Sequence, residues 1–227
     1  SGTTGPPKGV MISDANVMFL AQEVRGLIPI EDLTGMRIVS YLPMAHIAER
    51  TVSHYQHMIL GTEVSTCPDP SQVAAYCREV KPHVMFGVPR VWEKFNAGVV
   101  AALAADPEKA KQFDEAVAAA GPIALRRSHG VATEEDEATW SFLDDVAFKA
   151  VRALLGLDEL QFAISGAAPI PAPLLTWFRA IGVPMSEVYG MSENTGAMTW
   201  TAEKIKPGTV GPAMPGTELA LAEDGEV

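Results

Sequence analysis

The first nine residues read SGTTGPPKG and combine hydroxyl groups, glycines and a lysine. Glycine lets the backbone approach a ligand closely, and consecutive backbone N–H groups in such a turn form a concave anion site. Ser1, Thr3 and Thr4 add hydroxyl donors, and Lys8 adds a positive charge. The segment therefore predicts a cradle for phosphate oxygens.

A P-loop NTPase is excluded by the spacing. That motif requires G-x-x-x-x-G-K-[ST]. Counting from Gly2, the second glycine would fall on Pro7, and Lys8 is followed by Gly9 rather than by a hydroxyl residue. A Gly/Thr-rich terminus without a ligand stays open as the alternative.

Three later segments also carry groups suited to nucleotide chemistry. Residues 41–50 read YLPMAHIAER and place His46 after a predicted strand, and residues 165–169 read SGAAP, a turn of small residues. Residues 189–193 read YGMSE, which sets an aromatic ring close to a hydroxyl and a carboxylate.

In this order, the segments resemble the motifs of the acyl-adenylate-forming (AMP-binding) superfamily. Residues 41–50, together with GVPRVWEKF at residues 87–95, resemble its long-chain fatty-acid–CoA ligase branch. The resemblance implies that ATP activates a fatty acid to an acyl-adenylate, releasing pyrophosphate. Coenzyme A then receives the acyl group, releasing AMP. ATP, Mg²⁺ and coenzyme A are the cofactors and co-substrates implied.

The resemblance also implies a role for each site residue. Glu193 would hold Mg²⁺, Ser192 would donate to the α-phosphate, and His46 would lie by the acyl carboxylate. The phosphate-binding set would be Ser1, Gly2, Thr3, Thr4, Gly5 and Lys8, and the adenine-binding set would be Gly166, Ala167, Ala168, Tyr189 and Gly190. Taken alone, each residue has a plainer interpretation: a solvated glutamate, a turn-capping serine, a helix-start histidine or a buried tyrosine.

Composition bounds the class of protein. The chain has 227 residues, enough for a substantial core, and its net charge of −11 argues against a general nucleic-acid binder. Two cysteines are too few for a disulfide framework, and no apolar run is long enough for a transmembrane helix. No signal peptide is evident. These features favour a cytoplasmic protein; peripheral membrane contact for a lipid substrate and the oligomeric state stay open.

Strand and helix patterns alternate along the chain, which is typical of a parallel sheet covered by helices. Strands are expected over residues 37–42, 63–66 and 83–86, and before Gly166 and Gly190. Helices are expected from Ser13 and over residues 45–60, 71–80, 88–99 and 140–155. A pair of alanine-rich helices is expected up to about Ala120, with a break at Asp106-Pro107. Residues 128–137 are expected to form a surface loop, although Glu134 could begin a helix. Trp92, Phe95 and Val99 are expected in the core. Glu49 and Arg50 have two interpretations: markers of the long-chain branch in the resemblance, or simply a surface ion pair.

The resemblance predicts an α/β fold like the core of an acyl-CoA synthetase N-terminal domain. Residues 1–207 would form a partial nucleotide- and acyl-binding core, and residues 208–227 would begin a β-rich subdomain. The small C-terminal domain, with its catalytic lysine, would lie beyond Val227, so the piece by itself would be inactive. Two alternative functions stay open: adenylation with transfer to a carrier protein, and a non-catalytic nucleotide-binding or interaction module.

Overall fold

Six strands form the central sheet of the computed structural model, which describes residues 9–227. The strands are β1 (Arg37–Ser40), β2 (Glu63–Thr66), β3 (Val84–Gly87), β4 (Phe162–Ser165), β5 (Met185–Met191) and β6 (Gly196–Trp200). Their order is β2-β1-β3-β4-β5-β6, with β6 antiparallel to β5 and the other neighbours parallel. The α/β prediction is confirmed, and the carboxyl ends of β1, β3, β4 and β5 share one edge of the sheet.

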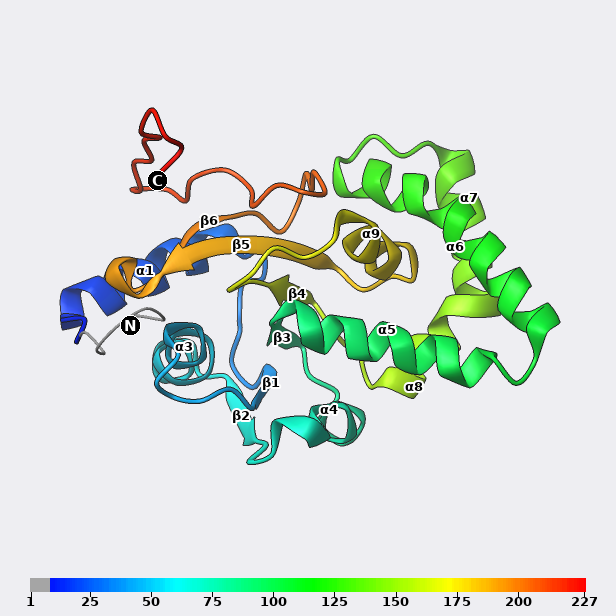
Figure 1. Cartoon of the computed structure of the whole chain (residues 1–227), viewed down its shortest axis with the longest axis horizontal. Coiled ribbons are helices and arrows are strands. Elements are labelled where there is room, and N and C mark those ends of the chain that lie inside the picture. Colours follow the sequence, from blue (N-terminus) through cyan, green and yellow to red (C-terminus); the bar gives the residue numbers. More distant parts are fainter. Residues whose placement is uncertain (1–8) are drawn as a thin grey trace.

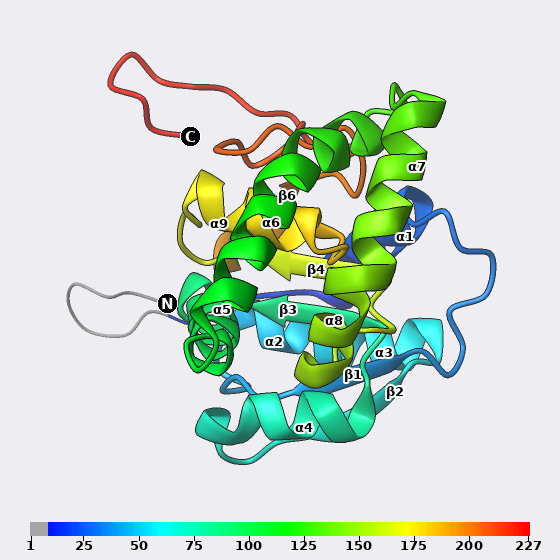
Figure 2. The ribbon, with the colours of Figure 1, turned by 90° about the vertical axis from the view of Figure 1, so that its right-hand side faces the viewer.

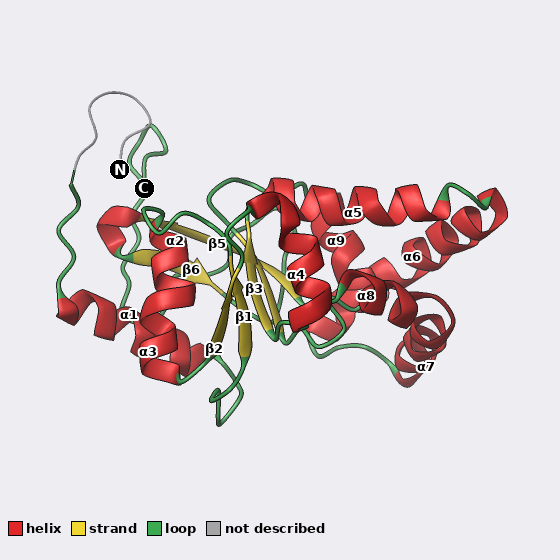
Figure 3. Ribbon diagram, turned by 90° about the horizontal axis from the view of Figure 1, so that it is seen from below, coloured by secondary structure: helices red, strands yellow, loops and turns green. Residues whose placement is uncertain are grey.

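Helices cover both faces of the sheet (Figures 1 and 3). One face carries α1 (Asp14–Leu27) and the continuous helix formed by α2 (Ile47–Glu49), a π-helical segment (Arg50–Tyr55) and α3 (Gln56–Leu60). The other side of the sheet carries a short 3₁₀ turn (Pro70–Gln72), α4 (Val73–Val80), α5 (Pro89–Leu103), α6 (Pro107–Ser128), α7 (Glu134–Leu143), a π-helical segment (Asp144–Phe148), α8 (Lys149–Leu155) and α9 (Ala172–Ala180). Figure 2 looks onto this second side, with α6 and α7 in front of the strands.

The two sheet faces bury two separate apolar clusters. Alternate residues of a strand point to opposite faces, so Met85 of β3 joins the larger cluster, which contains Trp92 and Phe178. Phe162 of β4 joins the smaller cluster under α1, with Trp200. Trp92, Phe95 and Val99 are at most 3% exposed, which confirms that these residues belong to the core.

Helix starts follow the local capping signals. The Ser13 hydroxyl accepts a hydrogen bond from the Asn16 backbone N–H at 3.2 Å, and Asp106 accepts from Lys109 N–H at 3.1 Å. The loop predicted over residues 128–137 is limited to residues 129–133, and α7 begins at Glu134, as the alternative for this stretch predicted. The Thr133 hydroxyl caps this helix by accepting from the Asp136 N–H at 3.1 Å.

Helix α6 extends beyond the end predicted near Ala120 and continues to Ser128, through Pro122. Proline removes one backbone donor from a helix. The buried face of α6, which includes Ala120, Ile123 and Ala124, nevertheless continues past the proline and faces α9. This packing outweighs the local break signal.

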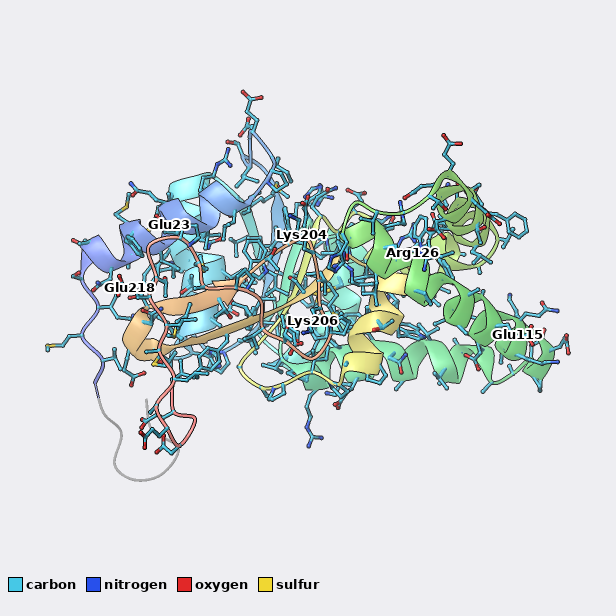
Figure 4. The ribbon with its side chains drawn as sticks, turned by 90° about the horizontal axis from the view of Figure 1, so that it is seen from above. Glu23, Glu115, Arg126, Lys204, Lys206 and Glu218 are labelled. Carbon is cyan, nitrogen blue, oxygen red and sulfur yellow. The ribbon has the colours of Figure 1, made fainter. Side chains whose placement is uncertain are left out.

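The segment after β6 crosses the sheet as a loop. Residues 208–227, all described, form no strand; Ala213 makes an isolated bridge to Thr199, and a turn closes between Ala222 and Glu226. Figure 4 shows Lys204 and Lys206 on this loop, and places Glu218 near Glu23 of α1, at the end of the molecule opposite Glu115 of α6. No helix within residues 9–227 combines the length and apolar character needed to cross a membrane.

Gly156 ends α8 in a left-handed conformation, with φ of +72°. A Cβ at this position would overlap the backbone of Cys77 and Arg78. We expect Gly156→Ala to lower the free energy of unfolding by about 3 kcal/mol or more, from backbone strain plus overpacking. Gly130 is the matched control: its φ is +68°, but a Cβ there would meet no atom within 4 Å. Gly130→Ala should cost about 1 kcal/mol. Denaturant unfolding of both variants checks this, and equal losses would contradict it.

Candidate functional site

An apolar cavity of about 310 Å³ lies between the sheet and the α1–α3 layer. Its floor is built from alternate residues of four parallel strands: Ile38, Val84, Phe86, Phe162, Ile164 and Val188. Its walls come from α1 and from the helix that runs from α2 to α3, where the lining residues recur at helical spacing: Val24, Ile47, Ala48, Thr51, Val52, Gln56 and Leu60. Apolar side chains that alternate along the strands thus face apolar side chains at helical spacing, and the space between them is suited to an apolar ligand.

Polar groups meet this cavity at the carboxyl edge of the sheet. His46 follows β1, Ala167 follows β4, and Gly190 and Ser192 lie at the end of β5; all four residues line the cavity. The structure therefore brings together four of the site residues predicted from distant segments. A ligand in the cavity would have its apolar part between sheet and helices, and its polar end near the Ser192 hydroxyl and the His46 ring.

His46 combines the two interpretations that the sequence left open. It is the N-cap of α2, and its Nδ1 accepts a hydrogen bond from the Ala48 backbone N–H at 3.2 Å. A neutral imidazole that accepts at Nδ1 carries its proton on Nε2, which is then a donor. The ring also lines the cavity. The cap thus fixes a hydrogen-bond donor at the cavity mouth.

The interpretation of Glu49 and Arg50 as a surface ion pair is wrong. Glu49 is 3% exposed, and its carboxylate accepts from the Ser40 hydroxyl at 2.5 Å and from the Leu42 backbone N–H at 3.1 Å. The Arg50 side chain points elsewhere and donates to the Met44 carbonyl at 2.8 Å. Adjacent helix residues project in different directions, and here Glu49 faces the sheet. Its carboxylate ties the turn after β1 to the helix that His46 begins.

Ser192 and Glu193 lie on the 3₁₀ turn Ser192–Asn194, which joins β5 to β6. The turn is compact: a Cβ on Gly190 would overlap the carbonyl of Gly196 on the facing strand. Glu193 is exposed at this turn. Mg²⁺ keeps several waters and takes one or two protein carboxylates plus substrate phosphates, so a single accessible carboxylate here fits that ion.

The predicted adenine-binding residues lie at the same edge: Ala167 and Gly190 line the cavity, whereas Tyr189 alternates with the cavity-lining Val188 and so faces the other side of β5. Ala167 of the turn after β4 has a left-handed φ of +67°, and a Cβ on Gly166 would come within 2.6 Å of Val188 Cγ1. Tyr189 is half-buried on β5. The turn and the tyrosine belong to the paired strands β4 and β5, so the small residues and the ring lie at neighbouring strand ends.

Glu187 is a further candidate site residue that the sequence reasoning missed. It lies two positions before Tyr189 and therefore on the same face of β5. Glu187 is 8% exposed; one carboxylate oxygen accepts from the Ile170 backbone N–H at 3.4 Å, and the other is buried without a hydrogen-bond partner among residues 9–227. Burial raises the pKa of this carboxyl. A glutamate inside a strand was the available signal, since charged residues are rarely buried unless they have a partner or a function.

Some predicted site residues cannot be placed. Ser1, Gly2, Thr3, Thr4, Gly5 and Lys8 lie outside the described residues. Within residues 9–227, no group of three or more His, Cys, Asp or Glu side chains gathers closely enough to hold a metal ion by itself. A site at Glu193 would therefore depend on substrate phosphates and water for its other ligands.

Comparison with protein families gives a match along the whole chain. Residues 1–227 match the AMP-binding enzyme family. A putative fatty-acid–CoA ligase of Mycobacterium tuberculosis, fadD11, is 38% identical and aligns with 100% of this chain and 40% of its own length. The long-chain-fatty-acid–CoA ligase ACSBG2 of Xenopus laevis is 34% identical over 88% of this chain and 28% of its own length. The chain thus spans less than half the length of these relatives.

Solved structures share the fold. The inhibitor-bound N-terminal domain of FACL13 from Mycobacterium tuberculosis superposes with a TM-score of 0.61 at 21% identity, covering 100% of this chain and 45% of that domain. The o-succinylbenzoate–CoA synthetase MenE of Bacillus subtilis, in complex with ATP and magnesium ion, superposes with a TM-score of 0.61 at 19% identity, covering 100% of this chain and 37% of that one. At these identities the likeness concerns the fold.

Proposed function

The chain belongs to the AMP-binding enzyme family, and from that premise we propose that it contributes the acyl- and nucleotide-binding core of a long-chain fatty-acid–CoA ligase. The observation that carries the proposal is the apolar cavity whose polar mouth is formed by His46, Ala167 and Ser192 at the carboxyl edge of the sheet. The names of the relatives support the ligase activity, and the cavity supports an acid with a long apolar chain.

The acyl chain would lie in the cavity with its carboxylate at the mouth. A fatty-acid carboxylate is already ionised at neutral pH, so no general base is required. The Nε2–H of His46 can donate to that carboxylate and orient it. Burial of the chain against Phe86, Ile164 and Val188 would supply about 0.8 kcal/mol for each methylene removed from water.

The nucleotide would lie across the carboxyl edge beside the acid. Tyr189 would stack on adenine, the small turn Gly166–Ala168 would cover its other face, and Glu187 would accept from its exocyclic amine. Ser1, Gly2, Thr3, Thr4, Gly5 and Lys8 would bind the β- and γ-phosphates. Glu193 would hold Mg²⁺, which neutralises triphosphate charge.

In the first half-reaction an acid carboxylate oxygen attacks the α-phosphorus of ATP, and the bond to pyrophosphate breaks. Negative charge grows on the α-phosphate oxygens, where the Ser192 hydroxyl would donate a hydrogen bond. In the second half-reaction the thiol of coenzyme A attacks the acyl carbon, and AMP leaves. The contribution of this chain is positioning and charge stabilisation, without a covalent enzyme intermediate.

Coenzyme A is the proposed acceptor. Transfer to a carrier protein and a non-catalytic module are not favoured, since the relatives are named fatty-acid–CoA ligases. We further propose residues 1–207 as the α/β core and residues 208–227 as the start of a second subdomain, with the adenylating lysine supplied from beyond Val227. A cytoplasmic location with peripheral contact to lipid, the source of the acid, completes the proposal.

The full-length protein tests the assignment. We expect pyrophosphate exchange into ATP that depends on a long-chain fatty acid, and AMP release that additionally depends on coenzyme A. If exchange occurs without an acyl-CoA product and the acyl group is transferred to an acyl carrier protein, the acceptor is the carrier protein and not coenzyme A. Absence of exchange with acids of every chain length, in a folded protein that binds ATP, would refute the proposal.

Glu187 gives a separate prediction, which concerns recognition of the adenine base of ATP. If its carboxylate accepts from the 6-amino group of adenine, the enzyme should prefer ATP over ITP, which lacks that group. Loss of a hydrogen bond to a charged acceptor corresponds to about 10- to 100-fold in kcat/KM. We expect Glu187→Leu to lower kcat/KM for ATP by that factor and to remove the preference, while Glu187→Gln, which keeps one acceptor oxygen, retains part of it. An unchanged ATP/ITP ratio in Glu187→Leu would contradict the contact.

A further inference from the structure

The turn that carries Ser192 and Glu193 has an unusual backbone. It ends at Thr195, a non-glycine residue with a left-handed φ of +64°, and continues into Gly196 with φ of +141°. L-residues rarely adopt such angles, so the surroundings must hold them in place. Within the turn, the Thr195 N–H donates to the Ser192 carbonyl at 3.0 Å. The local sequence alone therefore does not account for the conformation.

The holding contact comes from a distant part of the chain. The hydroxyl of Thr51, which is 7% exposed, donates to the Thr195 carbonyl at 3.0 Å across a separation of 144 residues. Thr195 is itself 5% exposed, so no solvent could replace this donor freely. A Cβ on Gly196 would approach Thr51 Oγ1 to 3.0 Å, which shows how closely the turn lies on this side chain.

Thr51 belongs to a segment that also serves the cavity. It lies in the π-helical stretch Arg50–Tyr55, and it lines the cavity together with Ile47 and Val52. π-helical turns are rare and are frequent at functional sites. At the start of the same helix, Glu49 binds the turn after β1 and His46 stands at the cavity mouth. One short helical segment thus touches the acid side of the site and supports the turn on the nucleotide side.

We propose that Thr51 is a positioning residue, whose hydroxyl fixes the Ser192–Thr195 turn so that Ser192 and Glu193 face the nucleotide. This inference rests on the proposed function, because it assigns a role to the turn in binding the ATP–magnesium complex. Because Thr51 also lines the cavity, its hydrogen bond fixes the spatial relation between the cavity, which would hold the acid, and the Ser192–Thr195 turn, which would bind the nucleotide. The distance between attacking carboxylate and α-phosphorus depends on that relation, and small displacements of reacting groups are costly in rate.

The test compares Thr51→Val with Thr51→Ser in the full-length enzyme. Valine keeps the shape but leaves the Thr195 carbonyl buried without a donor, whereas serine keeps the hydroxyl. We expect Thr51→Val to raise the Mg²⁺ concentration for half-maximal acid-dependent exchange by about tenfold, the order expected for one buried hydrogen bond. Thr51→Ser should stay within about twofold of the wild type.

A readout independent of activity is amide hydrogen exchange of the unliganded protein. Thr51→Val should speed exchange in the peptide covering residues 189–199, and should leave the peptides of β3 and α5 unchanged. Faster exchange in all peptides would mean a general loss of stability and would overturn the positioning role. The role would also be overturned if Thr51→Ser showed the same loss as Thr51→Val, or if Thr51→Val behaved like the wild type. Wild-type enzyme without acid-dependent exchange would instead refute the proposed function, so the two failures are distinguishable.

Discussion

Replacement of Glu193 by alanine in the full-length enzyme should lower acid-dependent ATP–pyrophosphate exchange by about 100- to 1,000-fold, the usual cost of removing a group that stabilises transition-state charge. The carboxylate is exposed on the Ser192–Asn194 turn, next to the cavity mouth. In nucleotide sites Mg²⁺ is usually held by one or two protein carboxylates together with phosphate oxygens and water. Loss of the ligand leaves the charge of the departing pyrophosphate poorly neutralised.

Two controls accompany this prediction. Glu203, an exposed glutamate on the loop after β6, is the matched control, and Glu203→Ala should leave exchange unchanged. Calorimetry should show that Glu193→Ala weakens ATP binding in the presence of Mg²⁺ but not in its absence. Near-normal exchange in Glu193→Ala would remove the metal-binding role from this residue.

Filling the cavity from the α2–α3 helix should shorten the acid that the enzyme accepts. Val52 lines the cavity, and phenylalanine at this position would occupy space that distal methylenes would use. Each methylene kept out of the cavity costs about 0.8 kcal/mol, so exclusion of two to four of them predicts a loss of about 10- to 200-fold in kcat/KM for long acids. Acids short enough to end before Val52 should keep their rates.

Two controls distinguish a change in how the acyl chain fits the cavity from a loss of protein stability. Met58 lies on the same helix but is 62% exposed and does not line the cavity, so Met58→Phe is the matched control and should not change the chain-length profile. The short acids serve as an internal control for folding and nucleotide binding. An equal loss for all chain lengths in Val52→Phe, or no loss for any, would show that the acyl chain does not occupy this cavity.

The sequence was a good guide wherever the determining signal was local. Ser13 and Asp106 begin helices because their side chains satisfy backbone N–H groups three residues ahead. Alternation of apolar runs with amphipathic stretches predicted the parallel sheet, and a parallel sheet places the ends of β1, β3, β4 and β5 at one edge. Motif resemblance then located Ser192 and Glu193 beyond the end of β5.

The sequence misled where a local signal competed with packing. Glu49 beside Arg50 suggested a solvated pair, but the helix places Glu49 against the sheet, where Ser40 and Leu42 bind its carboxylate. The alanine-rich stretch suggested that α6 ends near Ala120, but the helix continues to Ser128 because its apolar face packs beyond that point. In both cases burial decided against the short-range preference.

The sequence by itself determined the order of the elements, their caps and the types of chemical groups available, because each depends on residues a few positions apart. Tertiary structure alone decided that alternate residues of four strands enclose an apolar cavity together with α1 and the helix from α2 to α3, that Glu187 is buried beside Tyr189, and that the Thr51 hydroxyl reaches the Thr195 carbonyl. These relations join residues up to 144 positions apart. Such contacts depend on how helices and strands pack, and no periodicity within a segment encodes them.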